Sequence, residues 1–335
     1  MKSSNVISKF ILSFLVISMF WVSTTSAQGV TVNVRTYLQG AILSSFETGT
    51  THDRPLMRDD LRDNPFSNTR LIPDDDIYQT AHVVNDYITI DITPSFTHVA
   101  CGAYPQYQTI PDPFTVFAVT GEDAIVDWVF VELRDQDDYT SVVATRSGLL
   151  QRDGDVVDLD GVSKLFFPNV PVDNYFVVVR HRNHLGVMTK YPLTPQVMET
   201  LVDFSDINTD VFDFANTDNE FNYSGYALKS AANYDLQVMW GGDLDCNGKI
   251  IYLGEDDDLT VIHKEVAGFD MAQNPMLELS FDNAVGYLQG DFNMDGKTKF
   301  DNPNDDKNML FAQVIFYGVN TMYMANFAHL IEQLP

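Results

Sequence analysis

Two acidic loops near the C-terminus share one pattern, and this pattern constrains the chain more than any other feature. The first loop runs from Asp243 to Asp258, and the second runs from Asp291 to Asp306, 48 residues later because 291 less 243 is 48. In both loops Asp or Asn recurs at alternate positions and a Gly-Lys pair follows. This alternation lets a tightly turning backbone aim three side-chain oxygens at one point, as a large, hard cation requires. The repeat therefore predicts two calcium ions.

The position of each residue in the loop predicts its role as a ligand. The side chains at the alternate positions supply the first three ligands. The lysine after each glycine contributes its backbone carbonyl, while its side chain points to solvent. The twelfth positions hold Gly254 and Asn302, which lack the carboxylate that usually closes such a loop. Matched acids follow three residues later, so we predict enlarged loops. The predicted ligands are Asp243, Asp245, Asn247, Lys249 and Asp257 for one ion, and Asp291, Asn293, Asp295, Lys297 and Asp305 for the other.

Charge and repetition favour calcium over the simpler interpretation that these segments are solvated turns. Asp, Asn and Gly are ordinary turn formers, so a single copy would carry little weight. The first loop has six acids and one lysine, and the second has five acids and two lysines, so without metal the loops repel themselves at −5 and −3. The repeat also matches an aromatic residue, Tyr252 with Phe300. Asp256, which is matched by Asn304, is the alternative closing residue. An all-protein oxygen cage disfavours magnesium.

These loops resemble those of dockerin type I modules, in which two loop-helix calcium motifs pack together. The resemblance covers about residues 236–335 and is carried by the first six loop positions. The whole unit, Asp-x-Asp/Asn-x-Asp/Asn-Gly-Lys with a later pair of acids, is also similar to repeats in secreted surface proteins of Bacteroidota. Residues 126–134, 157–162 and 175–188 are similar to the N-terminal parts of those proteins. The resemblance implies an exported, EF-hand-like calcium-binding protein, and most of those relatives have no assigned role.

The N-terminus has the three parts of a secretory signal peptide. Lys2 and Lys9 precede an apolar run from Phe10 to Val22, and Thr25-Ser-Ala27 provides a small-residue end. The apolar run is shorter than the roughly 20 residues that a bilayer requires, which disfavours a membrane anchor. We therefore expect residues 1–27 to be removed and the mature protein to be extracellular or on the outer cell surface.

The rest of the chain predicts a mainly β protein with a smaller α-rich part. Short apolar strands separated by acidic turns indicate a β-sandwich over residues 28–205, of immunoglobulin-like or transthyretin-like character. Residues 206–235 are rich in Asp, Asn, Ser and Thr and are expected to form a linker, and residues 236–335 form the dockerin-like domain. The predicted strands are 30–35, 87–92, 126–133, 141–145 and 175–182; apolar residues at helical spacing predict helices around 259–266 and 309–314.

The net charge limits the classes of partner that the protein can bind, and the cysteine count limits its disulfides. The net charge is −27, and removing the two lysines of the signal makes it −29, which opposes nucleic acid and anionic lipid. No later segment is apolar enough to span a membrane. Cys101 and Cys246 are too few for a disulfide framework, and we favour unpaired thiols over a bridge. The acidic surface and the calcium loops leave a protein or a surface glycan as the partner.

Candidate catalytic groups are sparse. His181 and His184 follow an apolar strand, and in an extended segment residues three apart point to opposite faces, so we interpret them as turn residues. Asp127 and Glu132 are five apart on one strand, which also separates them. We therefore predict a non-catalytic protein acting in adhesion, ligand binding or assembly. The alternative is a secreted carbohydrate-binding or polysaccharide-degrading component, whose aromatic residues would be Tyr104, Tyr107, Phe221, Tyr223 and Tyr226.

Overall fold

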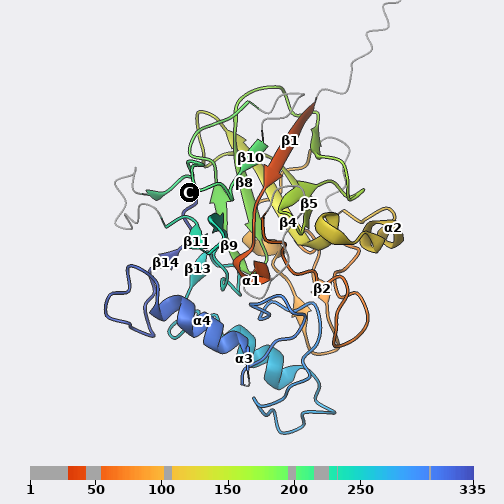
Figure 1. The fold of residues 1–335 in the computed structure, drawn as a ribbon, viewed down its shortest axis with the longest axis vertical. Coiled ribbons are helices and arrows are strands. Elements are labelled where there is room, and N and C mark those ends of the chain that lie inside the picture. The colour runs from red at the N-terminus through yellow and green to blue at the C-terminus, as the bar shows by residue number, and fades with distance from the viewer. Residues whose placement is uncertain are drawn as a thin grey trace, which may run out of the picture.

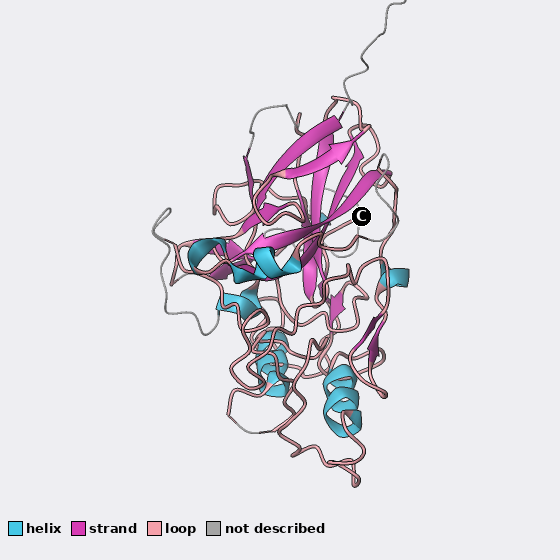
Figure 2. Cartoon of the chain, turned by 90° about the vertical axis from the view of Figure 1, so that its right-hand side faces the viewer, coloured by secondary structure: helices cyan, strands magenta, loops and turns pink. Residues whose placement is uncertain are grey.

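The computed structural model describes residues 29–42, 54–101, 108–194, 201–214, 226–231, 233–301 and 303–335. The expected signal peptide and four of the five aromatic residues named above, all except Tyr226, lie outside these ranges. The long strands of the main sheet occupy one end of the molecule, and helices α3 and α4 occupy the other (Figure 1). A view at right angles shows the same division, with the sheet above and the two helices below (Figure 2). The prediction of a mainly β chain is confirmed.

Eight strands form the main sheet, and their order is β10-β1-β6-β5-β4-β8-β9 with β7 paired to β1. All pairs are antiparallel except β1 with β10. The first half of β1 pairs with β7, whereas its second half pairs with β6 and β10. The bounds are β1 Gly29–Arg35, β4 Ile125–Asp135, β5 Val142–Gln151, β6 Asp155–Val157, β7 Leu165–Pro168, β8 Tyr175–His181, β9 His184–Met188 and β10 Leu201–Asp203.

Strand β4 lies at the centre of this sheet, between β5 and β8. Every residue of β4 from Ile125 to Arg134 is buried, so side chains on both faces of the strand are covered. Buried charges must be paired to be tolerated, and both acids of the strand satisfy this requirement. Glu132 binds Arg134 and Arg180, and Asp127 binds Arg182. The strand is therefore a structural centre that also fixes the β8–β9 hairpin.

The predicted strand over 87–92 is reduced to two residues, Thr89 and Ile90, although Ile90 and Ile92 are buried and alternate with exposed Tyr87 and Thr89. The segment over 54–76 has no helix and no extended strand, yet Met57, Leu61 and Ile72 are buried in the main core. The small elements are α1 Gln39–Ile42, β2 His82–Val83, β3 Thr89–Ile90, η1 Thr93–Ser95, α2 Pro113–Ala118, η2 Gly121–Asp123, β11 Lys229–Ala231, β12 Leu236–Val238, β13 Lys249–Ile250 and β14 Leu330–Ile331.

Both helices predicted at the C-terminal end are present, α3 at Leu259–Gly268 and α4 at Asp306–Ile315. Their apolar faces supply Ile262, Val266, Leu310 and Val314 to a second core, which Leu185 of β9 joins. The main core in turn includes five residues of the expected C-terminal domain: Leu236, Val238, Met239, Tyr287 and Met294. The two parts of the chain are therefore packed together through shared apolar contacts.

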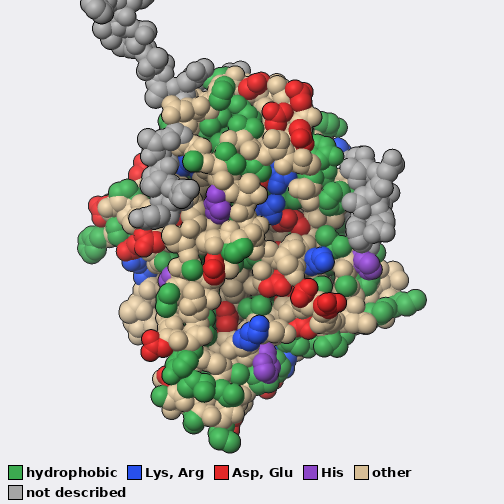
Figure 3. Space-filling view, turned by 180° about the vertical axis from the view of Figure 1, so that it is seen from behind, with side chains coloured by type: hydrophobic (Ala, Val, Ile, Leu, Met, Phe, Trp, Pro, Cys, Tyr) green, Lys and Arg blue, Asp and Glu red, His purple; other side chains and the backbone are tan. Residues whose placement is uncertain are grey.

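The surface reflects the acidic composition. Carboxylates are distributed over the face seen in Figure 3, and apolar side chains gather at its lower end. Met276 and Met322, in the segments that follow α3 and α4, are 77% and 78% exposed. Cys101 and Cys246 are free thiols. Within the described residues, no helix has the length and apolar character needed to cross a bilayer.

Candidate metal centre

The two loops repeat one hydrogen-bond pattern, residue for residue. The carboxylate of Asp243 accepts from the backbone N–H of Asn247 at 3.0 Å and of Gly248 at 3.2 Å. Asp291 accepts in the same way from Asp295 at 3.0 Å and from Gly296 at 2.7 Å. The next alternate positions continue the match, because Asp245 accepts from Asn247, Asn293 from Asp295, Asn247 from Lys249 and Asp295 from Lys297. The 48-residue repeat of sequence is thus a repeat of geometry.

The backbone turns where the sequence indicated it would. Gly248 and Gly296 have φ of 78° and 83°, a left-handed conformation that glycine adopts without steric cost. Cys246 and Met294 stand at the matched position two residues earlier, with φ of 57° in both. These are non-glycine residues in the left-handed region, so each loop holds a strained position at the same place.

The carboxylates that close the loops are Asp258 and Asp306, one residue after the predicted Asp257 and Asp305. Asp258 accepts from the N–H groups of Leu244 at 2.6 Å and Ile251 at 2.7 Å. Asp306 accepts from those of Phe292 at 2.8 Å and Lys299 at 2.7 Å, the residues 48 positions further along. Each closing carboxylate therefore joins the beginning of its loop to the residue three after the glycine.

Asp257 and Asp305 instead cap the helices. Asp257 accepts from the N–H of Thr260 at 2.9 Å, and Asp305 accepts from that of Asn308 at 2.6 Å. Asp305 is the residue directly before α4, whereas Asp257 lies two residues before α3 and also accepts from the N–H of Gly254 at 3.2 Å. Both carboxylates satisfy free N–H groups in the first turn of a helix. Both acids of each pair recur at the 48-residue offset, so matching the repeats alone did not separate the cap from the closing residue.

Three carboxylates of the first loop can hold one ion. Asp243, Asp245 and Asp258 each offer an oxygen, and these oxygens lie within 4.8 Å of one another. Two oxygens that bind the same calcium at about 2.4 Å are at most about 4.8 Å apart, so the spacing fits this cation. Asp258 already accepts two N–H groups, but each carboxylate oxygen has a second lone pair. In the second loop the matched positions are Asp291, Asn293 and Asp306, with the Asn amide oxygen as a neutral donor.

Burial makes these carboxylates unfavourable without a cation. It raises the pKa of Asp243 well above its usual range, and the nearby charges of Glu332 and Asp245 raise it further. Burial and then the charge of Asp291 do the same for the pKa of Asp306. A divalent cation would supply the missing opposite charge and allow ionisation.

The surroundings of the two loops differ. Asn247 of the first loop is exposed, whereas its counterpart Asp295 is only 6% exposed. The second loop is covered by the 54–72 segment: Arg58 donates to the carbonyl of Asn293 at 3.1 Å, and Asn64 donates to that of Asp295 at 3.0 Å. This contact could not be predicted, because the covering segment has no hydrophobic periodicity.

The two loop lysines also differ, which corrects the expectation that both point to solvent. Lys249 is exposed as predicted. The side chain of Lys297 is only 10% exposed; its Nζ donates to the carbonyl of Asp282 at 2.9 Å and lies 4.4 Å from the centre of the Phe66 ring. Lys297 therefore connects the second loop to Asp282 and Phe66, whereas the exposed Lys249 makes no such contact in the described residues.

The turn of the β8–β9 hairpin joins the sheet to both loops. Arg182 donates to Asp127 at 2.9 Å and to the carbonyl of Leu288, and its own carbonyl accepts from the thiol of Cys246 at 2.6 Å. Asn183 donates to the carbonyl of Asp291 at 2.9 Å. These contacts place the turn between the first and second loops.

Each helix also supports the loop of the other repeat. Glu265 on α3 accepts from the N–H groups of Gln289 at 2.9 Å and Gly290 at 2.8 Å, directly before the second loop. Gln313 stands 48 residues later on α4 and donates to the carbonyl of Gly241 at 3.1 Å, directly before the first loop. Sequence matching alone did not single out Glu265 and Gln313, because they lie outside the metal-binding positions.

The candidate catalytic groups are occupied with structural contacts. His181 and His184 lie opposite each other across the hairpin turn, with their Nδ1 atoms 3.0 Å apart, so the expectation that they point to opposite faces is wrong. The two-residue turn reverses the chain between them. His181 binds Asp127 at 3.2 Å, and the His184 Nε2 accepts from the N–H of Gly40 at 3.2 Å. Burial opposes ionisation of Asp127, but Arg182 and His181 lower its pKa to about 2.

Comparison of the whole chain with protein-family models, curated proteins and solved structures finds no match.

Proposed function

We propose that this chain is an exported, non-catalytic calcium-binding protein that acts at the cell surface or in the extracellular space, in adhesion, ligand binding or assembly. The observation that carries this proposal is the repeated loop geometry, in which buried carboxylates 48 residues apart accept matching backbone hydrogen bonds. Two ions are bound, one in each loop. The ligands are those predicted from the sequence, except that Asp258 and Asp306 replace Asp257 and Asp305.

The finer features of the fold belong to the same proposal. We infer that the N-terminal part is a β-sandwich, because β1 changes partners along its length, as strands do where they pass from one sheet to another. The C-terminal part is dockerin-like, because each loop leads into a helix and the helices support one another's loops. The resemblance to secreted surface proteins of Bacteroidota is consistent with this arrangement.

Three groups that the sequence offered for catalysis support a non-catalytic protein. Asp127 and Glu132 are each less than 2% exposed and ion-paired inside the sheet. His181 is buried between Asp127 and His184. General acid-base catalysis requires that a group reach a substrate proton, and these side chains contact only other protein groups.

Isothermal titration of metal-free protein with calcium tests the proposal. We expect two ions to bind, and we expect Asp258→Asn to remove the first and Asp306→Asn the second. Asp257→Asn is the matched control and should leave both, because Asn caps a helix as well as Asp does. Binding of no calcium by correctly folded protein would refute the proposed function.

Export is tested separately by fractionating the source cells and sequencing the N-terminus of the protein. The signal-like segment predicts a mature protein outside the inner membrane that begins at Gln28. Recovery of the full-length chain from the cytoplasm would contradict the proposed location without affecting the calcium sites.

A further inference from the structure

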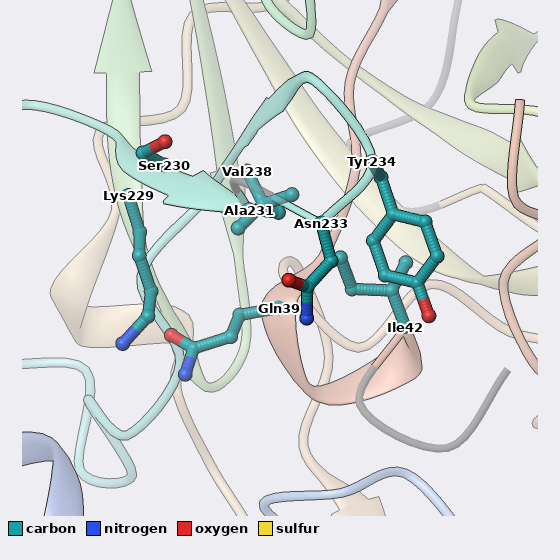
Figure 4. A pocket seen from close by; sticks show the side chains of 8 residues that line it. All are labelled: Gln39, Ile42, Lys229, Ser230, Ala231, Asn233, Tyr234 and Val238. Atoms are coloured by element: carbon teal, nitrogen blue, oxygen red, sulfur yellow. The ribbon is translucent and has the colours of Figure 1, made fainter.

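A pocket of about 280 Å³ opens between α1 and the β11–β12 hairpin, and its lining includes no residue of either metal loop. Its lining combines polar and apolar groups of different kinds. Lys229 and Gln39 lie side by side at one end, and Asn233 stands between Gln39 and the ring of Tyr234 (Figure 4). Ile42 provides an apolar wall beside that ring. Such a mixture of a cation, amides and an aromatic face is typical of sites for small polar ligands.

Lys229 is the unusual member of this lining. Its Nζ donates to the Gln313 Oε1 at 2.7 Å and lies 4.6 Å from the centre of the Trp240 ring. Across the described parts of the chain, no carboxylate lies within 4.0 Å of this ammonium group. Burial lowers the pKa of Lys229 to about 8. An acidic protein with 47 Asp and Glu residues therefore keeps a partly desolvated cation without an acidic partner.

The amides beside Lys229 are held in fixed positions. Gln39 donates to the Gln313 Oε1 at 3.1 Å, and Gln313 donates back to the Gln39 Oε1 at 2.8 Å. The N–H of Gly241 also donates to the Gln39 Oε1, at 3.1 Å. These bonds fix the orientation of the Gln39 amide beside Lys229 (Figure 4). Groups that are fixed before binding lose little conformational entropy when a ligand arrives.

We infer that this pocket binds a hexuronic acid, a sugar unit that carries a carboxylate. The carboxylate would pair with Lys229, the hydroxyl groups would bond to Gln39 and Asn233, and one face of the sugar ring would lie against Tyr234, whose side chain is 39% exposed. A neutral sugar would leave the ammonium without a counter-charge. A simple anion such as acetate would make no contact with the exposed part of Tyr234. This inference rests on the proposed function, since it names the ligand class of a binding protein.

Titration calorimetry of the calcium-loaded protein tests the inference. The probes are D-glucuronate, D-glucose, acetate and an oligosaccharide with internal glucuronate units. We expect glucuronate to bind at least tenfold more tightly than glucose or acetate. Tighter binding of the oligosaccharide identifies a glycan as the source of the unit, whereas binding of free glucuronate alone identifies the free sugar acid. Equal binding of glucose and glucuronate, or binding of neither, would overturn the inference.

Two variants and two matched controls locate the site. Lys229→Met keeps the length of the side chain and removes its charge, and we expect at least a tenfold loss of glucuronate affinity. Tyr234→Ala truncates an exposed ring, so it should weaken binding without affecting folding. The controls Lys190→Met and Tyr191→Ala change a partly exposed lysine and an exposed tyrosine that do not line the pocket, and they should have no effect. Unchanged affinity in both pocket variants would exclude this site.

The melting temperature of each sample, with and without calcium, separates this inference from the proposed function. If calcium raises the melting temperature but glucuronate does not bind, the proposed metal sites stand and only the pocket is refuted. Glucuronate binding by a protein that shows no response to calcium supports the pocket and refutes the calcium sites.

Discussion

The first and second loops have the same local geometry in different surroundings. In both, an initial Asp binds two N–H groups of the turn, and an acid at the start of a helix closes the loop. The first loop leaves Asn247 exposed and has Glu332 nearby, whereas the second is enclosed by Arg58 and Asn64. Under the proposed function, the motif would determine how an ion is held, and the surroundings would determine how easily it is exchanged. We expect the second ion to be structural and the first to respond to calcium concentration.

The largest effect should come from the residue that closes the enclosed loop. Asp306 is fully buried and accepts N–H groups from Phe292 and Lys299. Asp306→Asn places an amide N–H₂ against those donors and removes a metal ligand, so we expect a loss of about 3 to 5 kcal/mol in the free energy of unfolding. Urea denaturation in calcium measures it.

The neighbouring residue is the control for that variant. Asp305 caps α4, and Asn is an equally good cap, so Asp305→Asn should change the free energy of unfolding by less than about 0.5 kcal/mol. Equal effects of the two substitutions would mean that the closing carboxylate is not Asp306.

Asp305 and Asp306 show which features of the site can be predicted from the sequence and which cannot. The helices, the turn glycines and the alternate acids could be predicted because each depends on local periodicity or local backbone geometry. The choice between Asp305 and Asp306 could not, because both recur in the repeat and differ only in the direction of the side chain relative to the helix axis. Contacts such as Asn64 with the second loop depend on a segment 231 residues away, which carries no local pattern.

The next effect concerns stepwise release of calcium. Since the first loop is the more exposed, we expect a chelator to empty it at a higher free calcium concentration than the second. Each ion stabilises the fold by about 2.7 kcal/mol when free calcium is a hundredfold above its Kd. Differential scanning calorimetry at buffered calcium levels should therefore show two separate rises in melting temperature.

The variant Asp258→Asn assigns the two steps. It removes the closing carboxylate of the first loop and should abolish only the step that occurs at higher calcium. A single class of sites, or loss of the low-calcium step in this variant, would contradict the proposed division between the loops.

A smaller change in the free energy of unfolding is expected from pH, through Glu265, which supports the second loop. Burial raises the pKa of Glu265 from 4.5 to about 7. A carboxyl whose pKa is raised in the folded state stabilises the fold below its unfolded pKa, and this stabilisation is lost as pH rises through 7. We therefore expect Glu265 to contribute a fall of about 2 kcal/mol in the free energy of unfolding between pH 5 and pH 8 in saturating calcium.

The variant Glu265→Gln isolates this contribution. Gln keeps the size of the side chain, but it places an N–H₂ group against one of the two N–H donors of Gln289 and Gly290, so we expect the variant to be less stable at every pH. The variant should show a smaller fall in stability over the same pH range, whatever its absolute stability. Urea denaturation at several pH values measures both proteins, and parallel pH profiles would assign the dependence to other groups.

The smallest effects should come from Asn64 and Glu332, which lie next to the second and the first loop, respectively. Each substitution should change calcium binding at one loop only. Asn64→Ala removes the hydrogen bond to the carbonyl of Asp295 and should cost about 1 kcal/mol, expressed as weaker binding at the second site only. Glu332→Gln removes a negative charge that raises the pKa of Asp243, and it should reduce calcium affinity at the first site by a few fold. Calorimetric titration of both variants gives the two affinities separately. If either substitution changed both sites equally, the loops would be coupled through the hairpin turn of Arg182 and Asn183, and their different surroundings would not set their affinities independently.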